Sequence, residues 1–279
     1  MLKQRVITAV LLLAVLLPAL FARPVWPFAV LSLVVVATAG WEWGRLNGLG
    51  FAPAAVMGGA VVLVCLATWW VGFPVLQSAP LWWLVTGAWV LGGAYVLSCG
   101  PAKWPELPAA LRLSLGVVAL WLTWTALTQS KALGLNFLLS VFCLVWAADI
   151  AAYFGGRAFG RRKLAPAISP GKSWEGVWSG MVGVLVLAVA WIAADGRWDL
   201  GGDSLFTGVR SSFGWVGLIV ACAFLAAMSV VGDLFESLMK RSVGAKDSSQ
   251  LLPGHGGVLD RIDALLPVFP IALTLSLFR

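Results

Sequence analysis

Charged residues are scarce in this sequence, and their scarcity excludes a water-soluble globule. Asp, Glu, Lys and Arg make up 11% of the 279 residues, whereas apolar residues make up 61% and the mean hydropathy is +0.94. Apolar stretches follow one another with little interruption, so no polar surface remains to cover a globule in water. Helices satisfy their own backbone hydrogen bonds in lipid. We therefore expect an all-α, polytopic transmembrane helix bundle.

Cysteine and histidine are also rare. The four cysteines stand singly, without the paired spacing of a disulfide framework or a thiolate metal site. His255 is the only histidine, so any Ser-His-Asp or Cys-His relay would have to be built around it. The net charge is +7, but the basic residues are confined to short segments between apolar stretches. This distribution favours anionic lipid headgroups and phosphorylated substrates over nucleic acid as partners.

The apolar stretches predict about nine membrane spans, taking roughly 17–25 residues for each crossing. The first span is interpreted as an anchor, because no small-x-small cleavage site follows it and more apolar sequence does. The expected spans are 6–22, 25–41, 54–73, 80–98, 111–128, 132–150, 174–194, 213–234 and 264–278.

The distribution of basic residues predicts a cytoplasmic N-terminus. With that orientation, 14 of the 19 Lys and Arg residues fall on the cytoplasmic side, including Lys3 and Arg5, whereas Arg279 and four others fall outside. The polar segments 149–175 and 233–263 then share the cytoplasmic side. The longest opposite loop, 195–212, contains Asp195, Asp199 and Asp203.

The N-terminal region, 1–130, has few ionisable groups within its spans. Glu42 is the main exception, and we interpret it with Arg45 as a charged pair at the membrane boundary. Gly58-Gly59 and Gly92-Gly93 predict close helix approach. We therefore assign packing and oligomerisation to 1–130, and catalysis to 131–279.

The segment around 233–263 combines cations, carboxylates and glycines in a way that suits phosphate chemistry. Carboxylates can hold Mg²⁺, cations can neutralise phosphoryl oxygens, and glycine-rich turns let amides converge on an anion. The cations are Lys240, Arg241, Lys246 and Arg261, the carboxylates are Asp233, Asp247, Asp260 and Asp263, and the glycines are Gly254, Gly256 and Gly257.

A family resemblance rests on this segment. The run SLMKRSVGAKDSSQLLPGHGGVLDRID, residues 237–263, resembles the signature of the phosphatidate cytidylyltransferases at every fixed position. The run DIAAYFGGRAFGRRKLAPAISPGKSWEG, residues 149–176, is similar to that family's second polar block, with its D-x₃-Y, G-R-x₂-G and S-P-x-K-[ST]-x-E-G elements. The resemblance covers the C-terminal half closely and the N-terminal half only as a generic multi-span region.

The resemblance implies that phosphatidic acid and CTP form CDP-diacylglycerol and pyrophosphate. A phosphate monoester has a second pKa near ~6, so the lipid phosphate needs no side-chain nucleophile. Positioning and charge neutralisation should then dominate catalysis. The resemblance also implies Mg²⁺, leaves K⁺ open as a second cation, and suggests a homodimer in a bacterial cytoplasmic (inner) membrane.

Asp233 and Asp260 are the first metal candidates, and the family resemblance implies both. A carboxylate in a membrane span costs roughly 2.5–3.5 kcal/mol unless a cation meets it, which also favours Asp233 as a ligand. An ion pair with Lys240 is the structural alternative for Asp233. Asp149 is a third candidate, with a water-exposed helix end as its alternative. Glu236 is either a further ligand or a solvated group at the boundary.

The remaining candidates surround these carboxylates. Ser173 should cap a helix that begins near Trp174, and with Lys172 it either binds substrate or forms an ordinary cap. The expected catalytic residues are Asp233, Asp260, Lys246, Lys240 and Arg261. The expected substrate-binding residues are Lys172, Ser173, Arg157, Lys163, Ser237, Arg241, Asp247, His255, Gly256, Gly257 and Asp263.

Three other functions are compatible with parts of this pattern. Another CTP-dependent membrane lipid transferase or kinase would keep the nucleotide site and change the lipid pocket. A transporter would need polar groups near the membrane midplane, whereas the deep spans here are nearly bare. A noncatalytic lipid-binding scaffold would not need the constellation of Asp233, Asp260 and Lys246.

Overall fold

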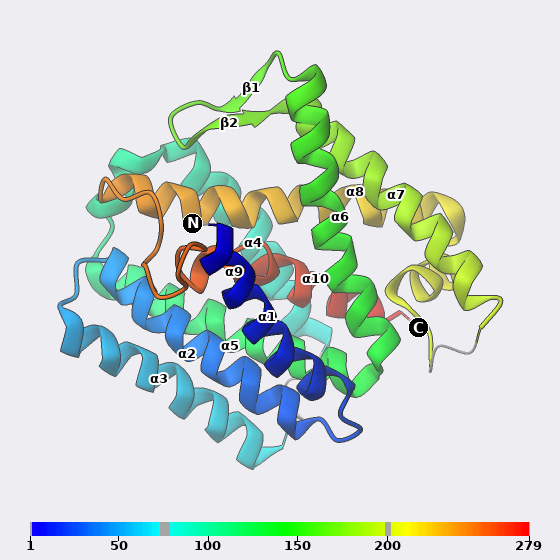
Figure 1. The fold of residues 1–279 in the computed structure, drawn as a ribbon, viewed down its shortest axis with the longest axis horizontal. Helices are drawn as coiled ribbons and strands as arrows, with labels where there is room; N and C mark the ends of the chain where they lie inside the picture. Colours follow the sequence, from blue (N-terminus) through cyan, green and yellow to red (C-terminus); the bar gives the residue numbers. More distant parts are fainter. Residues whose placement is uncertain (1, 73–78, 199–201, 279) are drawn as a thin grey trace.

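The computed structural model describes residues 2–72, 79–198 and 202–278. Asp199 and Arg279, and the side chains of Lys3 and Arg5, lie outside this description. The helices are α1 (Leu2–Phe21), α2 (Trp26–Leu46), α3 (Phe51–Val71), α4 (Ala79–Cys99), the 3₁₀ helix η2 (Pro101–Glu106), α5 (Ala109–Leu133), α6 (Leu135–Phe159), α7 (Trp174–Asp195), α8 (Leu205–Ser242), α9 (Leu259–Ile262) and α10 (Leu265–Ser276). Two short strands, β1 (Lys163–Ala165) and β2 (Ser169–Ser173), form an antiparallel hairpin between α6 and α7 (Figure 1).

The helical membrane bundle expected from the sequence is confirmed. Within the described residues, α2 to α8 are each long and apolar enough to cross a bilayer, and α1 contains a shorter apolar stretch, Val10–Phe21. The chain is therefore a membrane protein. Each of the nine expected spans coincides with one helix, while the number that cross the bilayer remains a prediction.

Several helices extend well beyond the apolar stretches that predicted them. α2 continues to Leu46, α6 to Phe159 and α8 to Ser242, so both polar segments begin on helices. At its other end α8 starts at Leu205, inside the expected loop 195–212, and bends at Gly214, where φ is 67°. The bend lets a short helical segment join the expected span 213–234.

Glycines bring neighbouring helices close together. A Cβ atom on Gly58 would lie 2.7 Å from the Ala37 carbonyl oxygen on α2, and one on Gly93 would lie 2.9 Å from the Val231 side chain on α8. Both contacts agree with the expected close approach. Gly59 and Gly92 instead face open space, with nothing within 4 Å of an added Cβ. One glycine of each pair is therefore a packing residue.

The two polar segments meet at one end of the bundle. In Figure 1, the hairpin stands at the end of α6, and α8 runs across the direction of α6. The Arg241 Nε donates a hydrogen bond of 3.2 Å to the Ile168 carbonyl between the two strands, which ties α8 to the hairpin. The two polar segments are therefore in contact, while their placement on the cytoplasmic side of the membrane stays a prediction.

Candidate active site

One face of the last turns of α8 carries most of the ionisable groups of the site. Asp233, Glu236, Ser237 and Lys240 are spaced by three or four residues, which places their side chains on one helix face. Ser237 Oγ donates to Asp233 Oδ1 at 3.2 Å. Behind them, a Cβ on Gly232 would lie 2.4 Å from the Asp263 carbonyl oxygen, so only glycine allows this approach to the segment after α9.

A cavity of about 560 Å³ opens beside this face, between α6, the hairpin, the start of α7 and α8. We call it the Lys172 cavity. Lys172 Nζ lies 2.6 Å from Asp233 Oδ2, and a third of the Asp233 side chain remains exposed. The lining residues are Asp149, Ala152, Tyr153, Gly156, Arg157, Ser169, Gly171, Lys172, Ser173, Gly176, Val177, Val230 and Asp233. The cavity thus brings together five of the predicted site residues.

The partner of Asp233 differs from the structural alternative considered above. Asp233 pairs with Lys172 of the hairpin, whereas Lys240 pairs with Glu236 at 2.5 Å and with Asp260 at 2.6 Å. The alternative interpretation, an ion pair between Asp233 and Lys240, is therefore wrong. Glu236 is fully buried, so its interpretation as a solvated boundary group is also wrong.

Negative charge exceeds positive charge around Lys172. Asp149 interacts electrostatically with both Lys172 and Asp233. Asp263 also faces Asp233, and burial together with the charge of Asp233 raises the pKa of the Asp263 carboxyl. The two acidic residues that line the cavity, Asp149 and Asp233, thus share the Lys172 ammonium group. Such a surplus of negative charge is suited to an additional cation.

Hard oxygen donors of this kind fit Mg²⁺. The ion is commonly held by one or two carboxylates together with substrate phosphates, rather than by a cage of protein ligands alone. Asp149 and Asp233 both line the Lys172 cavity and meet this requirement. In the described part of the chain, no three His, Cys, Asp or Glu side chains form a ready-made metal cluster. Substrate oxygens would complete the coordination.

Asp260 has a different environment, because its two oxygens are already hydrogen bonded. Oδ1 accepts from Lys240, and Oδ2 accepts from the Ser248 amide and hydroxyl at 3.0 Å and from the Gly257 amide at 2.8 Å. Burial alone would raise its pKa. Hydrogen bonds from Glu236, Lys240 and the two amides outweigh burial and lower the pKa of Asp260 to about 2.

Glu42 reaches this cluster from α2, and its predicted pairing with Arg45 is wrong. Glu42 is fully buried and accepts hydrogen bonds from Ser248, Ser249, Val258 and Leu259, whereas Arg45 donates to the Leu49 carbonyl. The expected span ended at residue 41, which placed Glu42 outside. An acid within an apolar helix was the signal that could have identified it.

The loop between α8 and α9 turns through two glycines. Gly254 and Gly256 have φ values of 77° and 83°, in the left-handed region that favours glycine. His255 lies between them, and its carbonyl accepts from Arg261. The Gly257 amide, an expected anion contact, is bound to the chain's own Asp260. Lys246 and Asp247 are exposed on this loop.

The β1–β2 hairpin holds the second polar segment. Ser173 caps α7 as expected, because its Oγ accepts from the Gly176 amide at 3.2 Å. Glu175, in the first turn of α7, accepts from the amides of Arg161 and Arg162. Arg157 lies at the cavity and contacts the Tyr153 hydroxyl, whereas Lys163 is exposed on β1. Lys163 is therefore not brought to the cavity wall.

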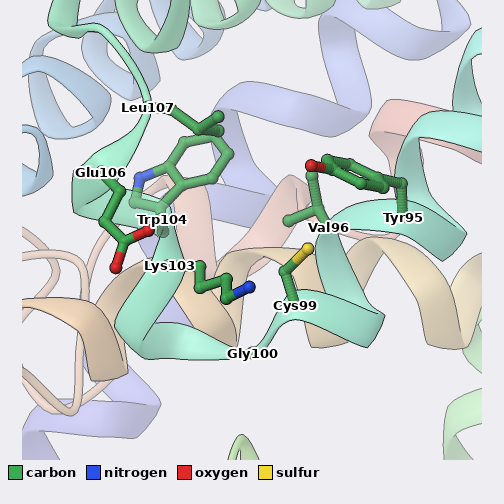
Figure 2. Close-up of a pocket in the computed structure, with 8 residues that line it drawn as sticks. All are labelled: Tyr95, Val96, Cys99, Gly100, Lys103, Trp104, Glu106 and Leu107. Carbon is green, nitrogen blue, oxygen red and sulfur yellow. The ribbon is translucent and has the colours of Figure 1, made fainter.

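A second cavity, of about 240 Å³, lies beside η2. Figure 2 shows its lining residues, which include Lys103, Glu106 and Tyr95 and come from outside both polar segments. Trp104 at its wall packs edge-on against Phe235 of α8, with ring centroids 5.4 Å apart. This cavity therefore lies behind the helix face that carries Asp233. The concentration of charged groups favours the Lys172 cavity as the active site.

Comparison with known proteins identifies the family of this chain. The model of the cytidylyltransferase family matches residues 3–278. A phosphatidate cytidylyltransferase of Haemophilus influenzae is 41% identical, with 97% of this chain and 96% of that protein covered. Those of Pseudomonas aeruginosa and Staphylococcus saprophyticus are 38% and 30% identical, covering 97% and 96% of this chain and 95% and 96% of theirs. This chain belongs to the cytidylyltransferase family.

Proposed function

We propose that the protein is a phosphatidate cytidylyltransferase, which joins CTP to phosphatidic acid and releases pyrophosphate. The observation that carries the proposal is the Lys172 cavity, where Asp149, Asp233 and Lys172 meet next to the segment 237–263. Carboxylates and a lysine around one cavity are suited to bind a nucleoside triphosphate together with its metal ion. Relatives that bear this enzyme's name match nearly the whole chain, which supports the substrate assignment.

The chemistry requires positioning more than proton transfer. An oxygen of the lipid phosphate attacks the α-phosphorus of CTP, the new P–O bond forms, and the bond to pyrophosphate breaks. Asp149 and Asp233 would hold Mg²⁺, with Asp260 as the further expected ligand and K⁺ as an additional candidate cation. When bound, Mg²⁺ neutralises phosphoryl oxygens as a Lewis acid.

Cationic side chains complete the charge neutralisation. Lys172 and Arg157 line the cavity and are suited to contact phosphoryl oxygens. Lys172 is paired with Asp233 and a quarter of its side chain is exposed, so its ammonium group can also contact a phosphate that enters the cavity. Lys240 stays between Glu236 and Asp260 and keeps the α8 face in place.

The substrates also indicate where the protein works. CTP is water-soluble and phosphatidic acid stays in its leaflet, so the cavity should open at a membrane surface. We place it at the cytoplasmic face of a bacterial inner membrane, in line with the positive-inside distribution. A homodimer is our proposed assembly, with the N-terminal helices as the contact.

The decisive experiment is an assay of the purified protein in detergent with Mg²⁺, CTP and phosphatidic acid. We expect pyrophosphate and a CDP-lipid in equal amounts, loss of turnover with EDTA, and recovery when Mg²⁺ is restored. D233N, D260N and K172M should each lower kcat by about 10³-fold or more while the protein stays folded.

A matched control and two outcomes complete the test. D203N changes an exposed aspartate just before α8, far along the chain from either polar segment, and should keep full activity. Absence of a CDP-lipid with every lipid phosphate tried would reject the proposed function. Near-normal turnover of both D233N and D260N would instead reject the metal assignment.

A further inference from the structure

Glu42 is held by four hydrogen bonds from a segment more than 200 residues away. Its Oε1 accepts from Ser249 Oγ at 2.5 Å and from the Val258 amide at 2.9 Å. Its Oε2 accepts from Ser248 Oγ at 3.1 Å and from the Leu259 amide at 2.6 Å. Each carboxylate oxygen thus has two donors. The side chain joins both ends of the loop that connects α8 and α9.

This environment requires a carboxylate. An amide side chain offers one oxygen acceptor and two N–H donors, so the backbone amide of either Val258 or Leu259 would face a donor, while the serine hydroxyl beside it would have to turn and accept. Unpaired buried donors are costly, because they lose water without a replacement. The fit is also close: a Cβ on Gly257 would lie 2.6 Å from Glu42 Oε1 and 2.0 Å from Ser248 Oγ. Glycine at 257 therefore leaves the space that Glu42 occupies.

The contacts continue from Glu42 to the site. Ser248 Oγ lies 3.1 Å from Glu42 and 3.0 Å from Asp260 Oδ2, so it stands between the two carboxylates. The Gly257 amide, next to the Val258 amide that Glu42 binds, donates to Asp260. Asp260 in turn contacts Lys240 of α8. Through these contacts, Glu42 fixes the position of the loop and therefore the position of Asp260, in the first turn of α9.

We propose that Glu42 is a positioning residue for nucleotidyl transfer, supplied by the N-terminal region to dock the 248–259 loop against α8. The inference rests on the proposed function for its effect on turnover. Its effect on the loop is independent of any activity. The N-terminal region thus contributes to the site as well as to packing.

The test compares E42Q with the wild-type protein by two measurements. Hydrogen–deuterium exchange in detergent should be about tenfold or more faster in peptides covering 245–259 of E42Q, and unchanged in peptides of α6 and α7. At a temperature where E42Q is folded, kcat should fall by about tenfold or more while KM for phosphatidic acid changes by less than about twofold. E42D, which restores the carboxylate with a shorter reach, should recover part of the kcat.

The control is N136A, which disturbs another buried polar network at the far end of α6. Asn136 bonds to Asp195, the Gly202 carbonyl and Trp191, so its loss should lower the melting temperature without changing turnover per folded molecule. Unchanged exchange of 245–259 in E42Q, or a loosened loop with normal kcat, would overturn the inference. An inactive wild-type protein would reject the proposed function, and the exchange measurement would still test the docking.

Discussion

Asp260 illustrates how neighbouring groups set the state of a single carboxylate. It lies in the first turn of α9, and its oxygens are bound by Lys240, Ser248 and Gly257. The motif identified the residue correctly as part of the polar cluster. The hydrogen-bond partners could not be predicted, because they depend on how the loop folds back onto α8.

The lowered pKa of Asp260 predicts a pH-dependent contribution to stability. Its folded pKa is about 2, below the ordinary value of 3.8, so the ionised form stabilises the fold above pH ~4 and loses this effect as pH falls towards 2. The shift corresponds to about 2 kcal/mol at neutral pH. We expect D260N to melt well below the wild-type protein at pH 7, with the difference in melting temperature closing as the pH falls from about 4 to about 2. A difference in melting temperature that stays constant over this pH range would contradict the lowered pKa of Asp260. The control variant D203N should melt at the same temperature as the wild-type protein throughout.

Glu42 and Lys172 mark the limit of residue-level prediction. Lys172 was assigned to substrate on its motif, and the structure places it at the cavity with Asp233 as its partner. Glu42 was set aside because, with Arg45 three residues on, it was interpreted as a charged pair at the membrane boundary. Its four partners lie at 248–259, and no local pattern in α2 indicates contacts over such a distance in sequence.

At the scale of elements, the apolar stretches located the helices but not their ends. Hydropathy reports where a helix passes through lipid, whereas backbone hydrogen bonding continues as long as the residues favour a helix. α8 therefore extends eight residues beyond the expected span 213–234 and carries Glu236, Ser237 and Lys240 in its final turns. The β1–β2 hairpin is short and polar, so its sequence lacks the alternation of apolar and polar residues that predicts a strand.

Neighbouring glycines of α3 offer a test of helix packing. Gly58 faces the Ala37 carbonyl of α2 at 2.7 Å, whereas Gly59 faces open space. G58A should force the two helices apart and lower the melting temperature. G59A should be neutral or raise stability by about 0.5–1 kcal/mol, because alanine favours the helix. Thermal unfolding of both variants in one detergent checks this, and equal losses would contradict the predicted difference between the two faces.

At the scale of the whole molecule, the site joins two regions that the sequence separated. The C-terminal region supplies the motif, and α2 of the N-terminal region supplies Glu42. Phe235, between Asp233 and Glu236, packs against Trp43, Trp89 and Trp104 from the N-terminal region. Helices of the N-terminal region therefore pack against α8 next to its catalytic face. The predicted division of the chain at residue 130 did not include this contact.

The two ends of α7 allow the predicted orientation in the membrane to be tested. This helix spans about 33 Å at 1.5 Å per residue, enough to cross the hydrocarbon core. The segment before it, 161–173, contains Arg161, Arg162 and Lys163 and includes the hairpin, whereas Trp198, 62% exposed, follows its other end. The positive-inside rule predicts that the hairpin lies in the cytoplasm. An R162C variant and a W198C variant, each in a background without the four native cysteines, can report the two ends separately.

With a membrane-impermeant maleimide, we expect W198C to be labelled in intact cells and R162C only after the membrane is opened. The reverse pattern would invert the topology and place the Lys172 cavity outside the cell, where cytosolic CTP could not reach it. Labelling of both variants from one side would instead mean that α7 does not cross the bilayer. Since the native cysteines stand singly and form no disulfides in the described part of the chain, their replacement should leave the fold intact. Only the expected pattern lets a soluble nucleotide meet a lipid phosphate at the Asp233 end of the bundle.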